Sequence, residues 1–167
     1  MKRALWIWIG LAWVLCSAGW GVWSNERILA AGRVVVLELA PMDPRSLMQG
    51  DYMALNYALN TALRQKHARE DAYAVLRLDD RQVATLLRVQ AELSSHTKPL
   101  AANEVAIRFR VRQNRVQIAT NAFFFQEGRE PEFRSARYGE FRVDCNGEPR
   151  LTALLDGELK RLGENRY

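Results

Sequence analysis

An uncharged apolar run near the N-terminus constrains this chain more than any other feature of its sequence. Residues 4–23 contain no charged side chain and follow directly after Lys2 and Arg3. A helix of about 20 residues spans roughly the 30 Å hydrocarbon core of a bilayer. The sequence therefore predicts a transmembrane helix over residues 4–23.

The tryptophans of this run favour the same interpretation. All five lie within it, two near its start, two near its end and one between, and this spacing is typical of interfacial aromatic belts. The alternative is a cleaved signal peptide, whose cleavage site would lie among the small residues at 16–19. The apolar run continues beyond those small residues, which favours retention of the segment.

Charge and composition predict the organisation of the remaining chain. The net charge is +5, of which Lys2 and Arg3 contribute two, so the rest is nearly balanced and does not favour nucleic-acid binding. A basic N-terminal tail is retained in the cytoplasm by the positive-inside rule. We therefore expect a cytoplasmic tail over 1–3, an anchor over 4–23 and an extracytoplasmic domain over 24–167, at the bacterial inner membrane with the domain in the periplasm.

The domain is expected to be mostly β. Short apolar or alternating runs, separated by polar connections, predict strands. These runs are 33–40, 52–59, 72–78, 83–90, 105–112, 115–125, 136–145 and 150–156. Asn146-Gly147 predicts a hairpin turn, Asn60 is expected to cap a helix over 61–71, and a second short helix is expected within 156–164. The predicted architecture is an antiparallel sandwich or small barrel.

Cysteine and histidine are too sparse to build a metal centre. Cys16 lies in the apolar run and Cys145 stands alone in the domain, so no disulfide is expected within the domain. His67 and His96 lie in polar surroundings far apart in the sequence. We expect no metal, no cofactor and no catalytic residue.

The segment 41–57 carries the most informative local pattern. Asp43 before Pro44 is typical of a helix start, and Gly50 is suited to end the turn that follows. Arg45 is expected to pair with Asp43 or Asp51. The segment is either a structural loop or a polar recognition loop.

The same segment carries a resemblance to a known family. Residues 50–57 read GDYMALNY and match, letter for letter, the motif of the GDYXXLXY protein family through Gly50, Asp51, Tyr52, Leu55 and Tyr57. The segments 41–49, 123–128 and 136–144 are also similar to the family's pattern. The resemblance implies a membrane-anchored bacterial protein that is encoded near multi-pass membrane proteins, and it implies no particular reaction.

The candidate binding residues follow from the motif and from two later positions. They are Asp43, Arg45, Gly50, Asp51, Tyr52, Leu55, Tyr57, Glu127 and Tyr138. Asp51 and Glu127 each adjoin a glycine, and they are the carboxylates available for acid–base chemistry, which requires two such groups in different environments.

Two further patterns allow a functional and a structural interpretation. Arg108, Arg110 and Arg112 alternate with apolar residues, and Arg115 follows across the expected turn. These arginines either bind an anionic polymer or lipid headgroup or form a solvated sheet face. At least one phenylalanine of 123–125 is expected to point away from the core, because successive strand residues face opposite sides.

These features predict a non-enzymatic interaction subunit of an inner-membrane complex. Its expected partners are the inner membrane and multi-pass membrane proteins, and not nucleic acid. The alternative is an envelope hydrolase or small-ligand sensor that uses the loop containing Asp43, Arg45, Asp51 and Tyr52.

Overall fold

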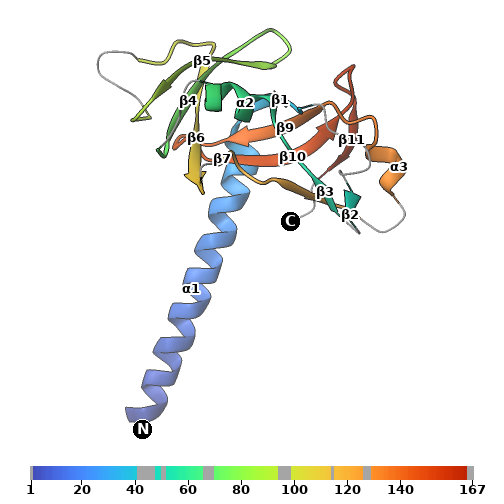
Figure 1. Ribbon diagram of the computed structural model, residues 1–167. Coiled ribbons are helices and arrows are strands. Elements are labelled where there is room, and N and C mark those ends of the chain that lie inside the picture. Colours follow the sequence, from blue (N-terminus) through green and yellow to red (C-terminus); the bar gives the residue numbers. More distant parts are fainter. Residues whose placement is uncertain are drawn as a thin grey trace.

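A long helix projects from a β-rich domain (Figure 1). The computed structural model describes residues 2–40, 48–49, 52–65, 70–93, 99–113, 115–125 and 129–164. The helices are α1 (Lys2–Ala31), α2 (Ala58–Gln65) and α3 (Glu130–Phe133). The strands are β1 (Arg33–Glu38), β2 (Met48–Gln49), β3 (Tyr52–Ala54), β4 (Ala72–Leu78), β5 (Ala84–Gln90), β6 (Glu104–Arg112), β7 (Arg115–Gln117), β8 (Ala122–Phe124), β9 (Tyr138–Val143), β10 (Pro149–Leu155) and β11 (Arg161–Glu164).

The predicted transmembrane helix is wrong. Residues 4–23 are helical, but they belong to the longer helix α1, and no helix in the described part of the chain is long and apolar enough to cross a membrane. Tryptophan and glycine are less apolar than the aliphatic residues of a typical span. Five tryptophans and three glycines within the run lower its mean hydropathy.

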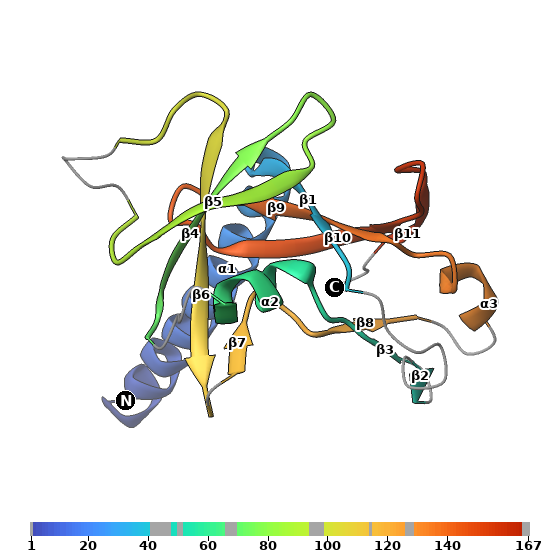
Figure 2. The same cartoon turned by 45° about the horizontal axis from the view of Figure 1, so that its top comes forward.

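The prediction of a mostly β domain is confirmed. Two four-stranded sheets have the orders β1-β9-β10-β11 and β5-β4-β6-β7, and a smaller sheet has the order β2-β3-β8. All paired strands in these sheets are antiparallel. Figure 2 shows β4 and β6 crossing the direction of β9 and β10, with α2 beside them.

One hydrophobic core joins the two larger sheets. Val35 and Leu37 of β1 contribute to it together with Phe141 of β9, and Ile107 and Phe109 contribute from β6. Val36, which lies between Val35 and Leu37 on β1, packs in a second cluster, so β1 is buried on both faces. This explains why β1 reads as a continuous apolar run rather than an alternating one.

The predicted Asn146-Gly147 hairpin is confirmed and joins β9 to β10. The Asp144 carboxylate accepts the backbone N–H groups of Asn146 at 2.9 Å and Glu148 at 2.8 Å. Gly147 has a φ of +79°, and an added Cβ would lie 2.9 Å from the carbonyl oxygen of Ala106. Both observations explain why this position requires glycine.

Both helix predictions within the domain are wrong in detail. The first helix runs over 58–65 rather than 61–71, and Asn60 lies inside it, where its Nδ2 donates to Asn56 Oδ1 at 3.2 Å. Burial of Leu59 and Leu63, which lie one turn apart, determines the position of the helix. In the tail, Asp156 accepts two backbone N–H groups in a turn, and the strand β11 follows in place of the predicted helix.

Two of the predicted strands differ more from their expected bounds than the others. The strand expected over 52–59 ends at Ala54, because α2 begins soon after it. The run 115–125 divides into β7 and β8, and Ala119 between them has a φ of +50°. Residues other than glycine seldom adopt this conformation, so the break is a local backbone feature that a hydrophobic pattern does not reveal.

Candidate functional site

The GDYXXLXY motif contains β3, the middle strand of the small sheet, and only the second half of the motif is described fully. Asp43, Arg45, Gly50, Asp51 and Glu127 lie outside the residues that the structure describes, as does the side chain of Tyr52. The predicted pairing of Arg45 with an aspartate and the predicted helix start at Asp43 therefore stay predictions. The backbone of Tyr52 opens β3, which pairs with β2 on one side and β8 on the other.

The second half of the motif packs into the core. Leu55 and Tyr57 are buried, and the Tyr57 hydroxyl donates to the Thr120 carbonyl oxygen at 2.8 Å. The Tyr57 ring meets the Phe141 ring edge to face, with centroids 5.5 Å apart. The Leu55 backbone N–H donates to Asn121 O at 2.7 Å. These contacts connect the end of β3 to the segment before β8 and to β9. Leu55 and Tyr57 therefore stabilise the packing of these strands.

Tyr138 is separate from this part of the motif. It lies at the start of β9, is half-buried, and packs on the second hydrophobic cluster, which contains Val36, Ala153 and Leu155. Tyr57 belongs to the main core instead. The structure therefore does not bring these two predicted binding residues together in one site.

The arginines of β6 form a charged outer face. Arg108 Nη1 and Arg110 Nη2 both contact Glu148 Oε1, at 3.1 and 3.3 Å, and Arg112 pairs with Asp71 at 3.2 Å. The five side chains of these pairs are between 36% and 60% exposed, so each pair contributes little to stability. This arrangement is that of a solvated sheet face in which the charges are mostly compensated.

The electrostatics of Asp71 are set by its partners on β6. The backbone N–H of Val111 donates to Asp71 Oδ1 at 2.8 Å and lowers the pKa of this carboxyl, and the nearby Arg112 guanidinium lowers it further. A carboxylate that accepts such hydrogen bonds is favoured over its protonated form. Asp71 therefore links the start of β4 to the end of β6.

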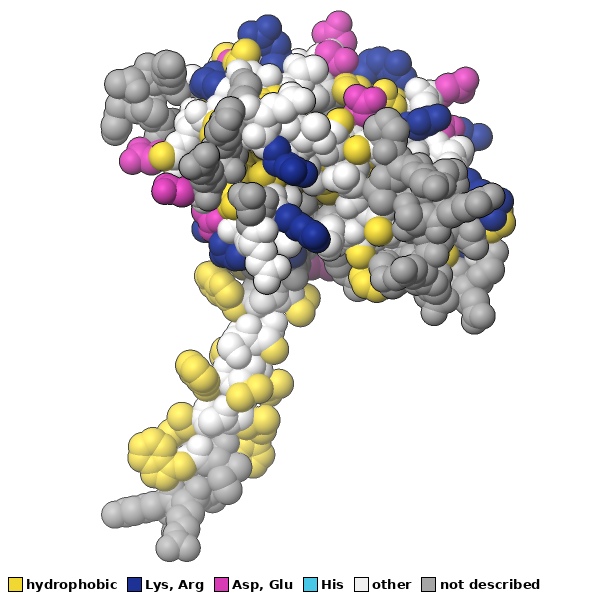
Figure 3. All heavy atoms as spheres, in the orientation of Figure 1, with side chains coloured by type: hydrophobic (Ala, Val, Ile, Leu, Met, Phe, Trp, Pro, Cys, Tyr) yellow, Lys and Arg dark blue, Asp and Glu magenta, His cyan; other side chains and the backbone are white. Residues whose placement is uncertain are grey.

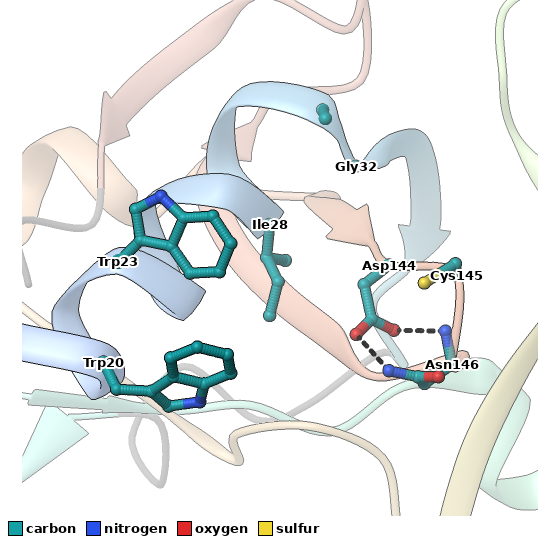
Figure 4. A pocket seen from close by; sticks show the side chains of 8 residues that line it. Trp20, Trp23, Ile28, Gly32, Asp144, Cys145 and Asn146 are labelled. Atoms are coloured by element: carbon teal, nitrogen blue, oxygen red, sulfur yellow. Dashed lines mark hydrogen bonds between the residues drawn. The ribbon is translucent and has the colours of Figure 1, made fainter. Parts of the chain in front are cut away.

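A pocket of about 340 Å³ lies where α1 meets the β9–β10 hairpin. Its lining residues are Trp20, Trp23, Ile28, Ala31, Gly32, Asp144, Cys145 and Asn146. Figure 4 shows the two indoles on the α1 side and the Asp144 carboxylate on the hairpin side. The indole centroids are 5.4 Å apart, with the rings tilted by 48°. We call this site the Trp–Asp pocket.

The Trp–Asp pocket was not among the residues predicted from sequence. Trp20 and Trp23 belong to the predicted interfacial belt, and their spacing of three residues also places them on one face of a helix. Asp144 precedes the predicted Asn146-Gly147 turn, and its sequence context indicates a turn residue only. What the sequence did not reveal is that the end of α1 packs beside the hairpin that follows β9.

A second pocket, of about 300 Å³, lies beside β8. Its lining residues are Phe123, Phe124, Phe125, Arg129, Phe133, Gly163 and Glu164. Phe123 is buried, Phe125 is half-buried and Phe124 is 66% exposed, which confirms that not every ring of this run faces the core. Arg129 lies over the Phe133 ring and pairs with Glu132, whose pKa it lowers.

The described residues include no group of three histidine, cysteine or acidic side chains placed to hold a metal ion. The described cysteines, Cys16 and Cys145, are both exposed and unpaired with one another.

Comparisons with known proteins identify a family. Neither the comparison with curated proteins nor that with solved structures gave a match. The model of the family described as GDYXXLXY protein matches residues 14–154, which is most of the chain and includes the motif, the hairpin and the Trp–Asp pocket. The chain therefore belongs to the GDYXXLXY protein family.

Proposed function

We propose that this protein is a non-enzymatic interaction subunit of a complex at the bacterial inner membrane, and that α1 is the element that binds its partner. The proposed partner is a multi-pass membrane protein, and the β-rich domain is proposed to lie on the periplasmic side. Membership of the GDYXXLXY protein family supports this setting, because that resemblance implies a bacterial protein encoded near multi-pass membrane proteins.

The observation that carries the proposal is the exposure of α1. Ten of its large apolar side chains are between 47% and 76% exposed in the described part of the helix. They are Trp6, Trp8, Ile9, Leu11, Trp13, Val14, Leu15, Trp20, Val22 and Trp23. Figure 3 shows such side chains along both visible sides of the helix below the domain. A helix that is hydrophobic all round is normally buried, because apolar surface in water costs about 25 cal/mol per Å².

The experiment compares partner recovery by two variants of the tagged full chain. Leu11→Gln with Leu15→Gln changes two exposed α1 residues one turn apart, and glutamine retains helix propensity. The matched control, Thr61→Gln with Arg64→Gln, changes two exposed residues of α2.

Each leucine removed from an interface is expected to weaken binding by about tenfold or more. Recovery of the partner from detergent-solubilised membranes should therefore fall strongly for the α1 variant and stay unchanged for the α2 control. The proposal is wrong if the α1 variant retains its partner at the level of the unmodified chain.

A further inference from the structure

We propose that the Trp–Asp pocket binds the cationic group of a basic side chain, a guanidinium foremost, supplied by the protein partner of α1. This inference rests on the proposed function and deepens it, because it specifies the chemistry of one contact in the complex. Three features of the pocket lead to it, and all three favour positive charge.

The first feature is the pair of indoles. Trp20 and Trp23 are 70% and 53% exposed, and their centroids lie 5.4 Å apart. A guanidinium or ammonium group is attracted to the face of an indole within about 6 Å of the ring centroid, and tryptophan is the most favourable aromatic residue for this contact. Two tilted rings at this spacing can both contact one planar guanidinium, which also stacks well on aromatic faces.

The second feature is the Asp144 carboxylate on the opposite wall. It is half-buried, and Oδ1 accepts two backbone N–H groups while Oδ2 accepts the Asn146 amide at 3.3 Å. A carboxylate oxygen has two acceptor positions, so Oδ2 can accept a further donor. No lysine or arginine of the described chain forms an ion pair with Asp144.

The third feature is the C-terminal end of α1, which lies in the pocket wall. Ile28, Ala31 and Gly32 belong to this end or directly follow it, and the last turn of α1 contains no basic residue. The C-terminal end of a helix carries a partial negative charge. Arg142 Nη1 donates to the Gly32 carbonyl oxygen at 3.0 Å and so compensates one carbonyl group on this side.

The position of the pocket identifies the source of the cation. The indoles of the pocket are also the last exposed aromatic side chains of α1, so the pocket continues the apolar surface to which the partner is proposed to bind. An arginine at the end of an apolar contact surface of the partner would complement the negative charge of Asp144 in the pocket. Guanidinium groups are common at such interfaces.

The test follows the five indole N–H signals of the isotope-labelled full chain by NMR. The probe is N-acetylarginine amide, and N-acetylcitrulline amide is its uncharged analogue of nearly equal shape. Trp20→Phe and Trp23→Phe assign the two pocket signals, and Trp6, Trp8 and Trp13 serve as references within the same helix. We expect the Trp20 and Trp23 signals to shift and saturate with the arginine probe only. Equal responses to both probes, or equal responses of all five tryptophans, would overturn the proposal.

Asp144→Asn tests the role of the carboxylate. The amide oxygen can still accept the two backbone N–H groups, so the hairpin is retained while the charge is lost. Affinity for the arginine probe should fall by about fivefold, the effect expected for a partly exposed charge pair. The matched control is Asp79→Asn, because Asp79 Oδ1 accepts the N–H groups of Arg81 and Val83 in the same type of turn elsewhere. Equal affinities of the two variants would overturn the proposal.

A second variant guards against an altered fold, and partner capture identifies the source of the cation. Trp20→Leu changes an exposed helix position and should abolish the probe response of Trp23, and a retained response would overturn the proposal. Asp144→Asn should also reduce partner recovery relative to Asp79→Asn. Weaker probe binding with full partner recovery would assign the pocket to a free cation and overturn the assignment to the partner.

If the Leu11/Leu15 variant loses the partner but no probe binds, the proposed function stands and the pocket inference fails. If the probe binds but the Leu11/Leu15 variant retains the partner, the proposed function fails instead.

Discussion

Tyr57 shows how one residue of the family motif is used in this fold. Its ring is buried against Phe141 and its hydroxyl reaches the Thr120 carbonyl oxygen, so both parts of the side chain hold neighbouring segments together. The sequence singles out this position through the family motif. It could not distinguish a recognition role from a packing role, because the partner atoms come from segments that are distant in sequence.

Tyr57→Phe should lower the free energy of unfolding by about 0.5–1.5 kcal/mol, since the Thr120 carbonyl loses a buried donor. Urea denaturation followed by circular dichroism measures this change. Tyr138→Phe is the control, because the described structure gives the Tyr138 hydroxyl no hydrogen-bond partner, and it should change stability little. Loss of partner binding by Tyr57→Phe without any loss of stability would instead indicate a recognition role.

Glu140 is the one charged side chain in the described core, where the residue is 8% exposed. It accepts hydrogen bonds from Thr152 Oγ1 at 3.0 Å and from Arg161 Nη2 at 2.7 Å. Arg161 also contacts Glu164, which is largely exposed. The same guanidinium therefore makes one buried contact and one exposed contact.

Arg161→Met should destabilise the protein by about 1–3 kcal/mol, because a buried carboxylate loses its charged partner. Glu164→Gln removes only the exposed contact and should cost less than about 1 kcal/mol. Thermal or urea denaturation of both variants tests the difference. Equal losses of stability would mean that the burial of Glu140 has no energetic consequence.

At the scale of elements, the sequence predicted strands well where the hydrophobic pattern is complete within one segment. β4 has the predicted bounds, and β6 begins one residue earlier than predicted, with Ile107 and Phe109 buried as their alternation indicates. The predicted bounds are wrong where contacts between distant segments determine which element forms. Burial of Leu59 and Leu63 positions α2, and β11 forms because its backbone pairs with the free edge of β10.

The contact between the start of β4 and the end of β6 should depend on pH. The pKa of Asp71 is lowered in the folded state, first by the Val111 N–H and then by Arg112, so the folded protein binds this proton less tightly than the unfolded chain. The resulting stabilisation is present above the ordinary pKa of aspartate and is lost as the pH falls through the lowered value.

Asp71→Asn should therefore be less stable than the unmodified protein at neutral pH, and the difference should shrink below about pH 4. Urea midpoints measured across this range provide the test. Arg112→Gln should retain most of the pH dependence, because the backbone N–H has the largest effect. If Arg112→Gln abolished it entirely, the order of these two effects would be reversed.

At the scale of the whole molecule, α1 and the domain have different surfaces. The domain buries most of its large apolar side chains, with Phe124 as the main described exception, whereas α1 exposes ten of them between Trp6 and Trp23 (Figure 3). The sequence predicted that this segment is apolar and helical. It did not predict that the helix continues to Ala31 and forms a pocket with the β9–β10 hairpin, because that pocket depends on the packing of distant segments.

The most direct test of the proposed function is site-specific photo-crosslinking of α1 to its partner in living cells. A photoreactive benzoylphenylalanine placed at Leu15, an exposed position of α1, should form a covalent adduct with a multi-pass membrane protein after irradiation. The same group placed at Thr85, an exposed position of β5, should not form that adduct. Adduct formation from position 85 with none from position 15 would contradict the account, because the partner would then bind the domain and not α1.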